Sequence, residues 1–405
     1  MSHIPPQRFL DRSTAPSIFT LIVLTGLGAL SMNVFLPSLP QMAEYFGAEY
    51  GVVQLSVALY LGVNAALQLL VGPLSDRYGR RPVMLVGVAI YCLASLGCLW
   101  APDVITFLVF RMIQASVVVG LVLGRAVVRD LYPRDQAASM IGYVTMGMAI
   151  VPMVGPVIGG ALGQAFGWKA NFWLLFGAGL MILLLAWADL GETARKGEGR
   201  LRDQFAQYPT LLLSRRFWGY NLSSTLASGA FFAYLGGAPL VGARIFGLEP
   251  ALLGLFFGAP ALGYFFGNFI SGRFSVRVGV DRMILWGALI TVAGLSTGLG
   301  LFFLGYKTAL VFFGSMTFVG LGNGMVLPNA TSGMMSIRPD LAGTASGLGG
   351  SIMLAGGASL SALSGVILSQ SDQAYPLIYL MLACAIGAAA SAIYTARRNH
   401  ALRIS

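Results

Sequence analysis

Long apolar stretches alternate with short polar connections along the whole chain. A helix of about 20 apolar residues is long enough to cross a bilayer, and uncharged stretches of that order recur from one end of the chain to the other. Only the fourth stretch carries charges in its interior. The pattern predicts twelve membrane-spanning segments, at roughly 16–38, 50–72, 83–101, 104–127, 138–164, 170–188, 217–240, 250–271, 283–304, 308–332, 342–368 and 374–396.

These segments are expected to be helices. In hydrocarbon the backbone must satisfy its own hydrogen bonds, which a helix does within a single segment. The composition agrees, because 57% of the residues are hydrophobic and only 10% are charged. So few charges could not cover the surface of a soluble protein of this length. The predicted fold class is therefore an all-α integral membrane protein.

A polar segment at 189–216 divides the chain into two parts with six expected spans each. We interpret residues 1–188 as an N-terminal half, 189–216 as a cytoplasmic linker and 217–405 as a C-terminal half. A repeated loop supports the division. Gly72–Pro82 lies between the second and third spans, and Gly272–Arg282 keeps its glycines, serine and one arginine in register in the second half. The sequence thus predicts a duplicated membrane protein.

The distribution of lysine and arginine predicts the orientation, because cytoplasmic loops are enriched in both. With a cytoplasmic N-terminus, the inner loops and tails carry 20 of the 25 basic residues. The outer loops carry Lys169, Arg244 and Lys307, while Arg111 and Arg125 lie within the fourth span. Both termini are therefore expected to be cytoplasmic. The net charge of +10 follows from this orientation, so it does not indicate a nucleic-acid partner.

Metal and cofactor chemistry has little support in the sequence. Cys92, Cys98 and Cys384 lie inside expected spans without metal-ligand or disulfide spacing, and His3 and His400 lie in the two tails. We therefore expect no metal, no cofactor and no enzymatic activity, since an integral enzyme would need a set of reactive side chains within the spans. A membrane sensor is the other alternative, but no loop is long enough for an output domain.

Several segments carry a resemblance to a known family. The loop Gly72–Pro82 resembles the loop signature of the major facilitator superfamily. Arg111-Met-Ile-Gln114-Ala resembles its fourth-helix signature, with Ala115 in place of the usual glycine. The run Gly147–Gly160 is similar to the antiporter signature. Together with Phe35–Pro40, Arg125–Tyr132 and Pro328–Thr331, these segments resemble the bicyclomycin/chloramphenicol-resistance (Bcr/CflA) drug exporters.

The resemblance implies a multi-pass transporter of the bacterial inner membrane that works as a monomer within the lipid bilayer. It would export small amphipathic compounds from the cytoplasm by alternating access, as a multidrug efflux pump and drug/proton antiporter. Two six-helix halves are the arrangement of this superfamily. The alternative within the same fold is an exporter or facilitator of one specific metabolite that is not coupled to protons.

The repeated loop suggests an inner gate. Asp76 lies among Arg77, Arg80 and Arg81 at the cytoplasmic end of the second span, where a carboxylate can pair with arginine and face a helix N-terminus. The resemblance implies that the partner is the eleventh span, which starts near Asp340. The simpler alternative is a solvated charged turn. Arg129 and Asp130, at the inner end of the fourth span, fit an ion-pair latch better than a proton carrier.

Polar residues within the spans are candidates for a substrate cavity. Arg111 is expected to face the cavity, with Gln114 one turn further along, because intramembrane charges are costly and usually functional. Polar residues at helical spacing add Tyr60, Asn64 and Gln68 on the second span, Asn221 on the seventh, and Tyr264 and Asn268 on the eighth. The alternative for each of them is a hydrogen bond between helices, and for Arg111 it is a packing role satisfied by carbonyls.

A carboxylate expected of a proton-driven exporter is missing. All 15 acidic residues lie in tails, loops or helix ends, and Asn33 stands where the resembling family typically has aspartate. Asparagine can bind a substrate, and it joins the cavity candidates, but it cannot titrate. This favours a neutral or anionic ligand over a multivalent cation. Finally, Gly155, Pro156, Gly159 and Gly160 are expected to kink the fifth span and allow close helix packing.

Overall fold

The computed structural model describes residues 8–131, 140, 151–152, 154–193, 207–338, 341–371 and 373–404. Within these ranges the chain is helical and forms no strand. Eleven described helices are long and apolar enough to cross a membrane. A shorter apolar helix, Val154–Phe166, covers part of the expected fifth span, and the remainder of that span lies largely outside the described residues. The all-helical membrane class is confirmed, whereas the count of twelve spans stays a prediction.

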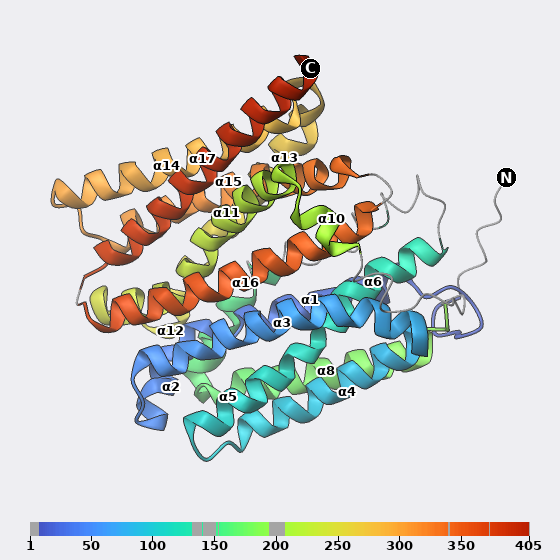
Figure 1. The fold of residues 1–405 in the computed structure, drawn as a ribbon. Helices are drawn as coiled ribbons and strands as arrows, with labels where there is room; N and C mark the ends of the chain where they lie inside the picture. Colours follow the sequence, from blue (N-terminus) through green and yellow to red (C-terminus); the bar gives the residue numbers. More distant parts are fainter. Residues whose placement is uncertain are drawn as a thin grey trace.

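The first group of helices comes from residues 18–189 and lies in the lower part of Figure 1, in blue to green. Its members are α1 (Ile18–Asn33), η1 (Leu36–Ser38), α2 (Leu39–Phe46), α3 (Tyr50–Tyr78), α4 (Arg80–Leu99), α5 (Val104–Ile113), η2 (Gln114–Val117), α6 (Val118–Leu131), the helix Val154–Phe166 and α8 (Lys169–Asp189). Within the group, α1 packs on α6 and α8, and α4 packs on α8.

The second group comes from residues 208–404 and lies in the upper part of Figure 1, in yellow to red. It contains α10 (Tyr208–Leu212), α11 (Arg215–Leu240), η3 (Val241–Ile245), α12 (Pro250–Phe256), α13 (Ala259–Val278), α14 (Val280–Phe303), α15 (Ala309–Ile337), α16 (Ala342–Ser369) and α17 (Tyr375–Ile404). Here α15 packs on α13 and α14, and α11 packs on α16 and α17.

Three expected spans are not continuous α-helices: the first, the fourth, and the eighth, which is divided between α12 and α13. The first ends as α1 at Asn33 and continues through η1 and α2, where Pro37 and Pro40 remove backbone donors. The fourth starts at Asp103, whose side chain accepts hydrogen bonds from the Thr106 amide at 2.9 Å and hydroxyl at 2.8 Å. These bonds hold the pKa of the Asp103 carboxyl below its usual range. That span then tightens into the 3₁₀ turn η2, which separates α5 from α6.

Small residues allow the closest helix contacts. The Pro260 carbonyl occupies the space that a Cβ atom on Gly320 would need, and the Thr317 carbonyl does the same at Gly263. This brings the backbones of α13 and α15 together, as is common for helices in membranes.

The two groups meet mainly along α3 and α16, which run antiparallel and side by side in the middle of Figure 1. Gly51 lies against Gly365, Gly62 against Ala358, and Gly350 against the Gln68 side chain. This contact sets the relative position of the polar side chains discussed next.

Candidate functional site

Arg111 is the largest fully buried side chain among the described residues, with 1% of its surface exposed. It lies near the C-terminal end of α5. One terminal nitrogen donates to Gln114 Oε1 at 2.6 Å and to Ser31 Oγ at 3.1 Å, and the other donates to the Ser31 carbonyl at 2.7 Å. Gln114 in turn donates to Ser95 Oγ at 2.7 Å. The cluster therefore ties α5 and η2 to α1 and α4.

Two aromatic rings cover the Arg111 guanidinium. Its central carbon lies 4.4 Å from the centroid of the Phe35 ring and 4.3 Å from that of the Tyr60 ring. A cation over an aromatic face is stabilised by the ring quadrupole, and more so away from water. In this conformation Arg111 is thus enclosed by protein rather than facing open space, contrary to the expectation from the sequence. A role for Arg111 and Gln114 in binding substrate stays a prediction.

The three polar residues predicted to form a stripe on α3 lie in two different environments. Tyr60 is buried under Arg111, and its hydroxyl donates to the Gly28 carbonyl at 3.4 Å. Asn64 is also buried and donates to the Tyr60 carbonyl at 3.2 Å. Gln68 is half-buried against α16, and its Oε1 atom has no hydrogen-bond partner. Gln68 is therefore the member of the stripe that lies between the two groups of helices.

The stripes in the second group also differ from each other. Asn221 on α11 is fully buried and donates to the Gly349 carbonyl of α16 at 3.0 Å. In this conformation it therefore forms a hydrogen bond between two helices of the same group. Tyr264 and Asn268 on α13 are half-buried, and the Asn268 amide donates to the Tyr264 carbonyl at 2.8 Å. Asn33, the last residue of α1, is buried and donates to the Ala29 carbonyl at 2.7 Å.

Hydrogen bonds join the two groups of helices at one end of the bundle. The buried Gln54 of α3 donates to the Ser361 carbonyl of α16 at 2.7 Å, and the Tyr50 hydroxyl donates to the Gly236 carbonyl of α11 at 2.8 Å. Gln164 donates to Glu249 at 2.6 Å. We call this set of contacts the joined end. None of its side chains was among the predicted site residues, because they come from segments far apart in the sequence.

Glycines of the fifth span complete the joined end. The Val34 carbonyl occupies the space of a Cβ atom on Gly159, and the Pro250 carbonyl of α12 occupies that of Gly160. Pro156 places its own carbonyl against Gly254 of α12, while Gly155 lies beside Asn33 at ordinary contact distance. The helix Val154–Phe166 therefore lies close to α1 and to α12, which belong to different groups.

The repeated loop forms an ion-pair cluster centred on Arg80. Arg80 pairs with Asp76 at 2.5 Å and with Asp130 at 3.1 Å, and it donates to Ser75 Oγ. Asp130 is thus held as an ion-pair partner of Arg80, and its role as a latch stays a prediction. Arg77 lies over the ring of Tyr78, 5.3 Å from its centroid. The Arg129 side chain lies outside the described residues, as does the Asp340 start expected for the eleventh span.

Glu192 caps the N-terminus of α4. This capping role was not predicted from the sequence. Its carboxylate accepts hydrogen bonds from the backbone amides of Arg80 at 2.8 Å and Arg81 at 3.2 Å. Arg81 also donates through its side chain to the Leu190 carbonyl at 2.8 Å. A carboxylate is favourable at this position because the first amides of a helix lack partners within it. Leu190 and Glu192, at the start of the expected linker, therefore bind the loop Gly72–Pro82.

The second copy of the loop is built differently. Gly79 and Gly279 have similar backbone angles, with φ of +100° and +91°. Asp281, however, accepts hydrogen bonds from Tyr220 at 2.7 Å and Asn399 at 2.8 Å instead of pairing with an arginine of its own loop. A cavity of about 530 Å³ lies beside it, between α11, α14, α15 and α17. The two loops are thus related in backbone and different in chemistry.

Asp189 is a second residue that the sequence did not single out. It ends α8, is fully buried, and accepts hydrogen bonds from the Leu10 and Ser17 amides, both at 2.8 Å, and from the Thr20 hydroxyl at 2.7 Å. A buried carboxylate is stable only when its oxygens are satisfied in this way. Asp189 therefore fixes the start of α1 and the segment before it.

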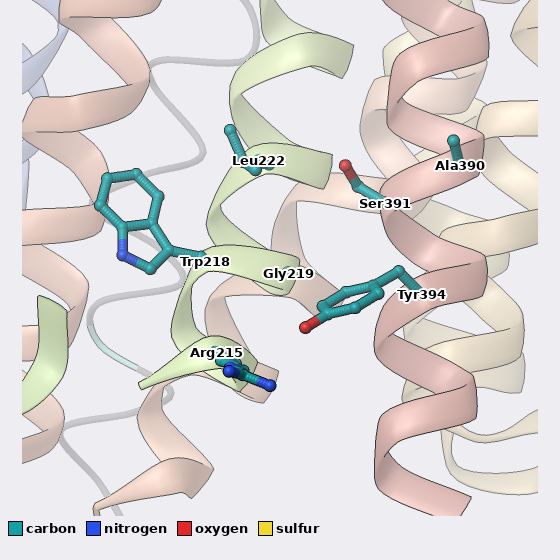
Figure 2. Close-up of a pocket in the computed structure, with 7 residues that line it drawn as sticks. All are labelled: Arg215, Trp218, Gly219, Leu222, Ala390, Ser391 and Tyr394. Atoms are coloured by element: carbon teal, nitrogen blue, oxygen red, sulfur yellow. The ribbon is translucent and has the colours of Figure 1, made fainter. Parts of the chain in front are cut away.

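A shallow cavity of about 370 Å³ lies between α11 and α17 (Figure 2). Figure 2 shows Trp218 and Leu222 on one helix and Tyr394 and Ser391 on the other. All of its lining residues belong to these two helices of the second group, so it does not lie between the two groups. Among the described residues, no group of three or more His, Cys, Asp or Glu side chains could hold a metal ion.

Comparison with known proteins identifies the class that this fold and these loops define. Residues 21–362 match the family model of the Major Facilitator Superfamily. The chain belongs to this superfamily, which is a family of transporters.

Individual relatives and a solved structure agree with this assignment. The chain is 32% identical over 361 residues to Multidrug resistance protein D of Escherichia coli, covering 86% of this chain and 88% of that protein. It is 29% identical over 396 residues to the Bicyclomycin resistance protein homolog of Haemophilus influenzae, covering 96% of this chain and 98% of that protein. Its fold matches a bacterial homologue of the human lysosomal transporter Spinster, crystallised in an inward-facing and occupied conformation. That match has a TM-score of 0.74 at 18% identity, covering 94% of this chain and 96% of that one. The resemblance to drug-resistance transporters is confirmed, and the chain is a multi-pass protein of the bacterial inner membrane.

Proposed function

We propose that the chain exports small amphipathic compounds by alternating access between two six-helix halves, 1–188 and 217–405, in exchange for protons. The observation that carries the proposal is the joined end. There the two groups are held by hydrogen bonds such as Gln54 to Ser361 and Gln164 to Glu249, and by backbone contacts at glycines. Each such hydrogen bond contributes only about 1 kcal/mol. Contacts of this kind can form and separate in each transport cycle.

The orientation of this conformation follows from the predicted topology. With both termini cytoplasmic, Tyr50 and Ser369 lie at the outer side, so the joined end closes the outer side. If the antiparallel contact of α3 and α16 were extended inward from Gln68 and Gly350, it would bring Asp76 alongside the first turn of α16. Asp76 would face that helix N-terminus when the inner side closes. In the conformation described here it pairs with Arg80 instead.

The substrate would pass between polar side chains of both halves. Gln68 on α3 and Tyr264 and Asn268 on α13 are half-buried, and Gln68 lies against Gly350 of α16 in the other group. Tyr60, Asn64, Asn221, Arg111 and Gln114 would line the path only after a rearrangement, because they are buried here. The relatives named for multidrug and bicyclomycin resistance support export of drug-like compounds.

One observation favours a second candidate, an exporter or facilitator of one metabolite without proton coupling. Asn33 cannot titrate, and Asp130 is already paired with Arg80 at 3.1 Å. Asp76 and Asp130, the acidic residues among the gating and coupling candidates, are thus both paired with Arg80 in this conformation.

Two measurements test the proposal and separate it from the alternative. Expression in a bacterium that lacks its own efflux pumps should raise the growth-inhibiting concentration of several amphipathic drugs. Purified protein in liposomes should then move such a drug faster when a pH gradient is imposed. Unchanged drug susceptibility would contradict multidrug export. Drug movement that is indifferent to the pH gradient would contradict proton coupling alone.

A further inference from the structure

The helices α4 and α14 begin at the same place in the two copies of the repeated loop, but only one of these N-termini is capped. Each helix follows a glycine with positive φ. In the first copy the Glu192 carboxylate accepts from the Arg80 amide at 2.8 Å and from the Arg81 amide at 3.2 Å. The corresponding amides of the second copy belong to Val280 and Asp281, and no described residue accepts from them.

The neighbouring helix explains this difference. In the first group α4 packs on α8, which ends three residues before Glu192 and so lets that side chain reach the cap. In the second group α14 packs on α17, which continues as a helix past Asn399. The Asn399 amide donates to the Asp281 carboxylate at 2.8 Å and to the Tyr220 hydroxyl at 2.7 Å. A Cβ atom on Gly279 would meet no described atom within 4 Å, so the space at this helix start is open.

The cavity of about 530 Å³ described above lies at this start of α14. Its lining includes two arginines, Arg216 of α11 and Arg282 of α14, and two serines of α15, Ser332 and Ser336. Asp281 is the acidic residue of the lining. Two guanidinium groups therefore face one carboxylate, and the cavity has a positive formal charge.

The hydrogen bonds around the cavity leave this positive charge available. Both Asp281 oxygens are occupied, one by the Tyr220 hydroxyl and the other by the Asn399 amide. Arg216 donates through its Nε atom to Asn399 Oδ1 at 2.8 Å, and its terminal nitrogens have no described partner. Arg282 is exposed and forms no ion pair with any described residue. The lining thus offers N–H donors to an anion.

The cavity lies at the depth of the lipid headgroups. Arg216 is in the first turn of α11, Arg282 is in the first turn of α14, and Ser336 is in the last turn of α15. The ends of membrane-spanning helices reach the polar zone of the bilayer. The predicted topology places this end at the cytoplasmic leaflet, which contains anionic lipids, and basic pockets between helices bind their headgroups.

We propose that this cavity binds a phosphate group, carried by a phospholipid headgroup or present as free phosphate. The Arg216 and Arg282 guanidinium groups supply charge-assisted donors, and the amides of Val280 and Asp281 supply the helix N-terminus. The phosphate takes the place that the Glu192 carboxylate has in the first copy. This inference goes beyond the proposed export function, because the site belongs to one group of helices and does not involve the exported compound.

The test compares phosphate-bearing and phosphate-free probes on the purified full-length protein in dodecyl maltoside. The probes are dioctanoylphosphatidylglycerol, dioctanoylglycerol and inorganic phosphate, titrated by calorimetry at neutral pH. Dioctanoylglycerol has the same acyl chains without the phosphate, so it measures binding by the chains alone. The wild type should bind at least one phosphate-bearing probe more tightly than dioctanoylglycerol. Binding of phosphatidylglycerol alone identifies a lipid site, and equal binding of inorganic phosphate identifies a site for the free ion.

Variants of the lining decide whether the bound phosphate occupies this cavity. Arg282→Gln should weaken binding by about tenfold, because a charge-assisted hydrogen bond is lost. Arg277→Gln is the matched control, since it removes an exposed arginine of the same loop that does not line the cavity, and it should leave the Kd unchanged. Ser336→Glu adds a carboxylate that competes for the arginines and should weaken binding, whereas Ser336→Gln should not.

Two results overturn the proposal. One is that neither phosphate-bearing probe binds the wild type more tightly than dioctanoylglycerol. The other is that Arg282→Gln has the same Kd as Arg277→Gln. If Arg282→Gln does not purify as a folded protein, the comparison of Ser336→Glu with Ser336→Gln decides by the same criterion. Failure to export drugs would instead contradict the proposed export function, and it would leave these Kd values measurable.

Discussion

At the scale of single residues, Arg111 shows how a buried charge can stabilise one conformation. Its removal in Arg111→Ala leaves the Ser31 carbonyl and Gln114 Oε1 without their donor and opens space between Phe35 and Tyr60. We expect a loss of about 2–3 kcal/mol, since buried polar groups lose their partners. Thermal unfolding in detergent, followed by size-exclusion chromatography, would measure it.

The growth-inhibition panel distinguishes this bracing role of Arg111 from substrate binding. If Arg111 braces α5 against α1, Arg111→Ala should sensitise cells to all exported compounds alike. Gln114→Ala should act in the same direction with a smaller effect, because it leaves the two bonds to Ser31 in place. Sensitisation restricted to particular compounds would show that Arg111 contacts substrate.

Asp189 gives a second prediction at the residue scale. Asp189→Asn replaces one acceptor oxygen by an NH₂ group, which cannot accept from the Ser17 amide or the Thr20 hydroxyl. We expect a destabilisation of about 2 kcal/mol that loosens the start of α1. Hydrogen exchange should become faster at residues 8–20, with residues 215–240 of α11 as an internal reference. Unchanged exchange at residues 8–20 would contradict the anchoring role.

At the scale of elements, the two copies of the loop offer a matched pair of glycines. Gly79 and Gly279 precede α4 and α14 with φ of +100° and +91°, so an alanine at either position is strained by about 1–3 kcal/mol. A Cβ atom on Gly79 would also meet the Glu192 carboxylate, whereas the space around Gly279 is open. Gly79→Ala should therefore lower the melting temperature more than Gly279→Ala.

The variant Glu192→Gln tests whether the Glu192 cap accounts for the difference between Gly79→Ala and Gly279→Ala. It keeps the shape of the cap but removes the negative charge at the N-terminus of α4, so it should be slightly destabilising on its own. Combined with Gly79→Ala it should add little, because both changes disrupt the same contact. Equal melting temperatures for the two alanine variants would contradict the capping role of Glu192.

At the scale of the whole molecule, the helical class and most of the span positions could be predicted from the sequence. They follow from uninterrupted apolar runs, which report burial in lipid directly. The site could be predicted only in part. Gln54, Gln164 and Glu249 look like ordinary polar residues near span ends, and their pairing exists only once two groups of helices meet. Likewise, Asp189 and Glu192 looked like parts of a solvated linker until the fold placed them at the N-termini of α1 and α4.

The same comparison explains why Arg111 and Arg125 could not be told apart in the sequence. Both are arginines in one apolar stretch, fourteen residues apart. The 3₁₀ turn at η2 changes the helix rotation between them. In the structure Arg111 is enclosed by Phe35 and Tyr60, whereas the Arg125 side chain is only half-buried.

The joined end leads to a prediction about the whole transport cycle. If the two groups must separate there, a covalent link across it should stop export. Gln164 and Glu249 are suitable positions, because their side chains are hydrogen-bonded at 2.6 Å and exposed, whereas the native cysteines are buried. The double variant Gln164→Cys with Glu249→Cys, treated with a short bis-thiosulfonate cross-linker, should lose drug export and recover it on reduction. Asp103→Cys with Thr106→Cys places the same link within one group, between two side chains joined by a similarly exposed hydrogen bond of 2.8 Å, and should still export after the same treatment. Export that survives cross-linking of the first pair would contradict alternating access through this end.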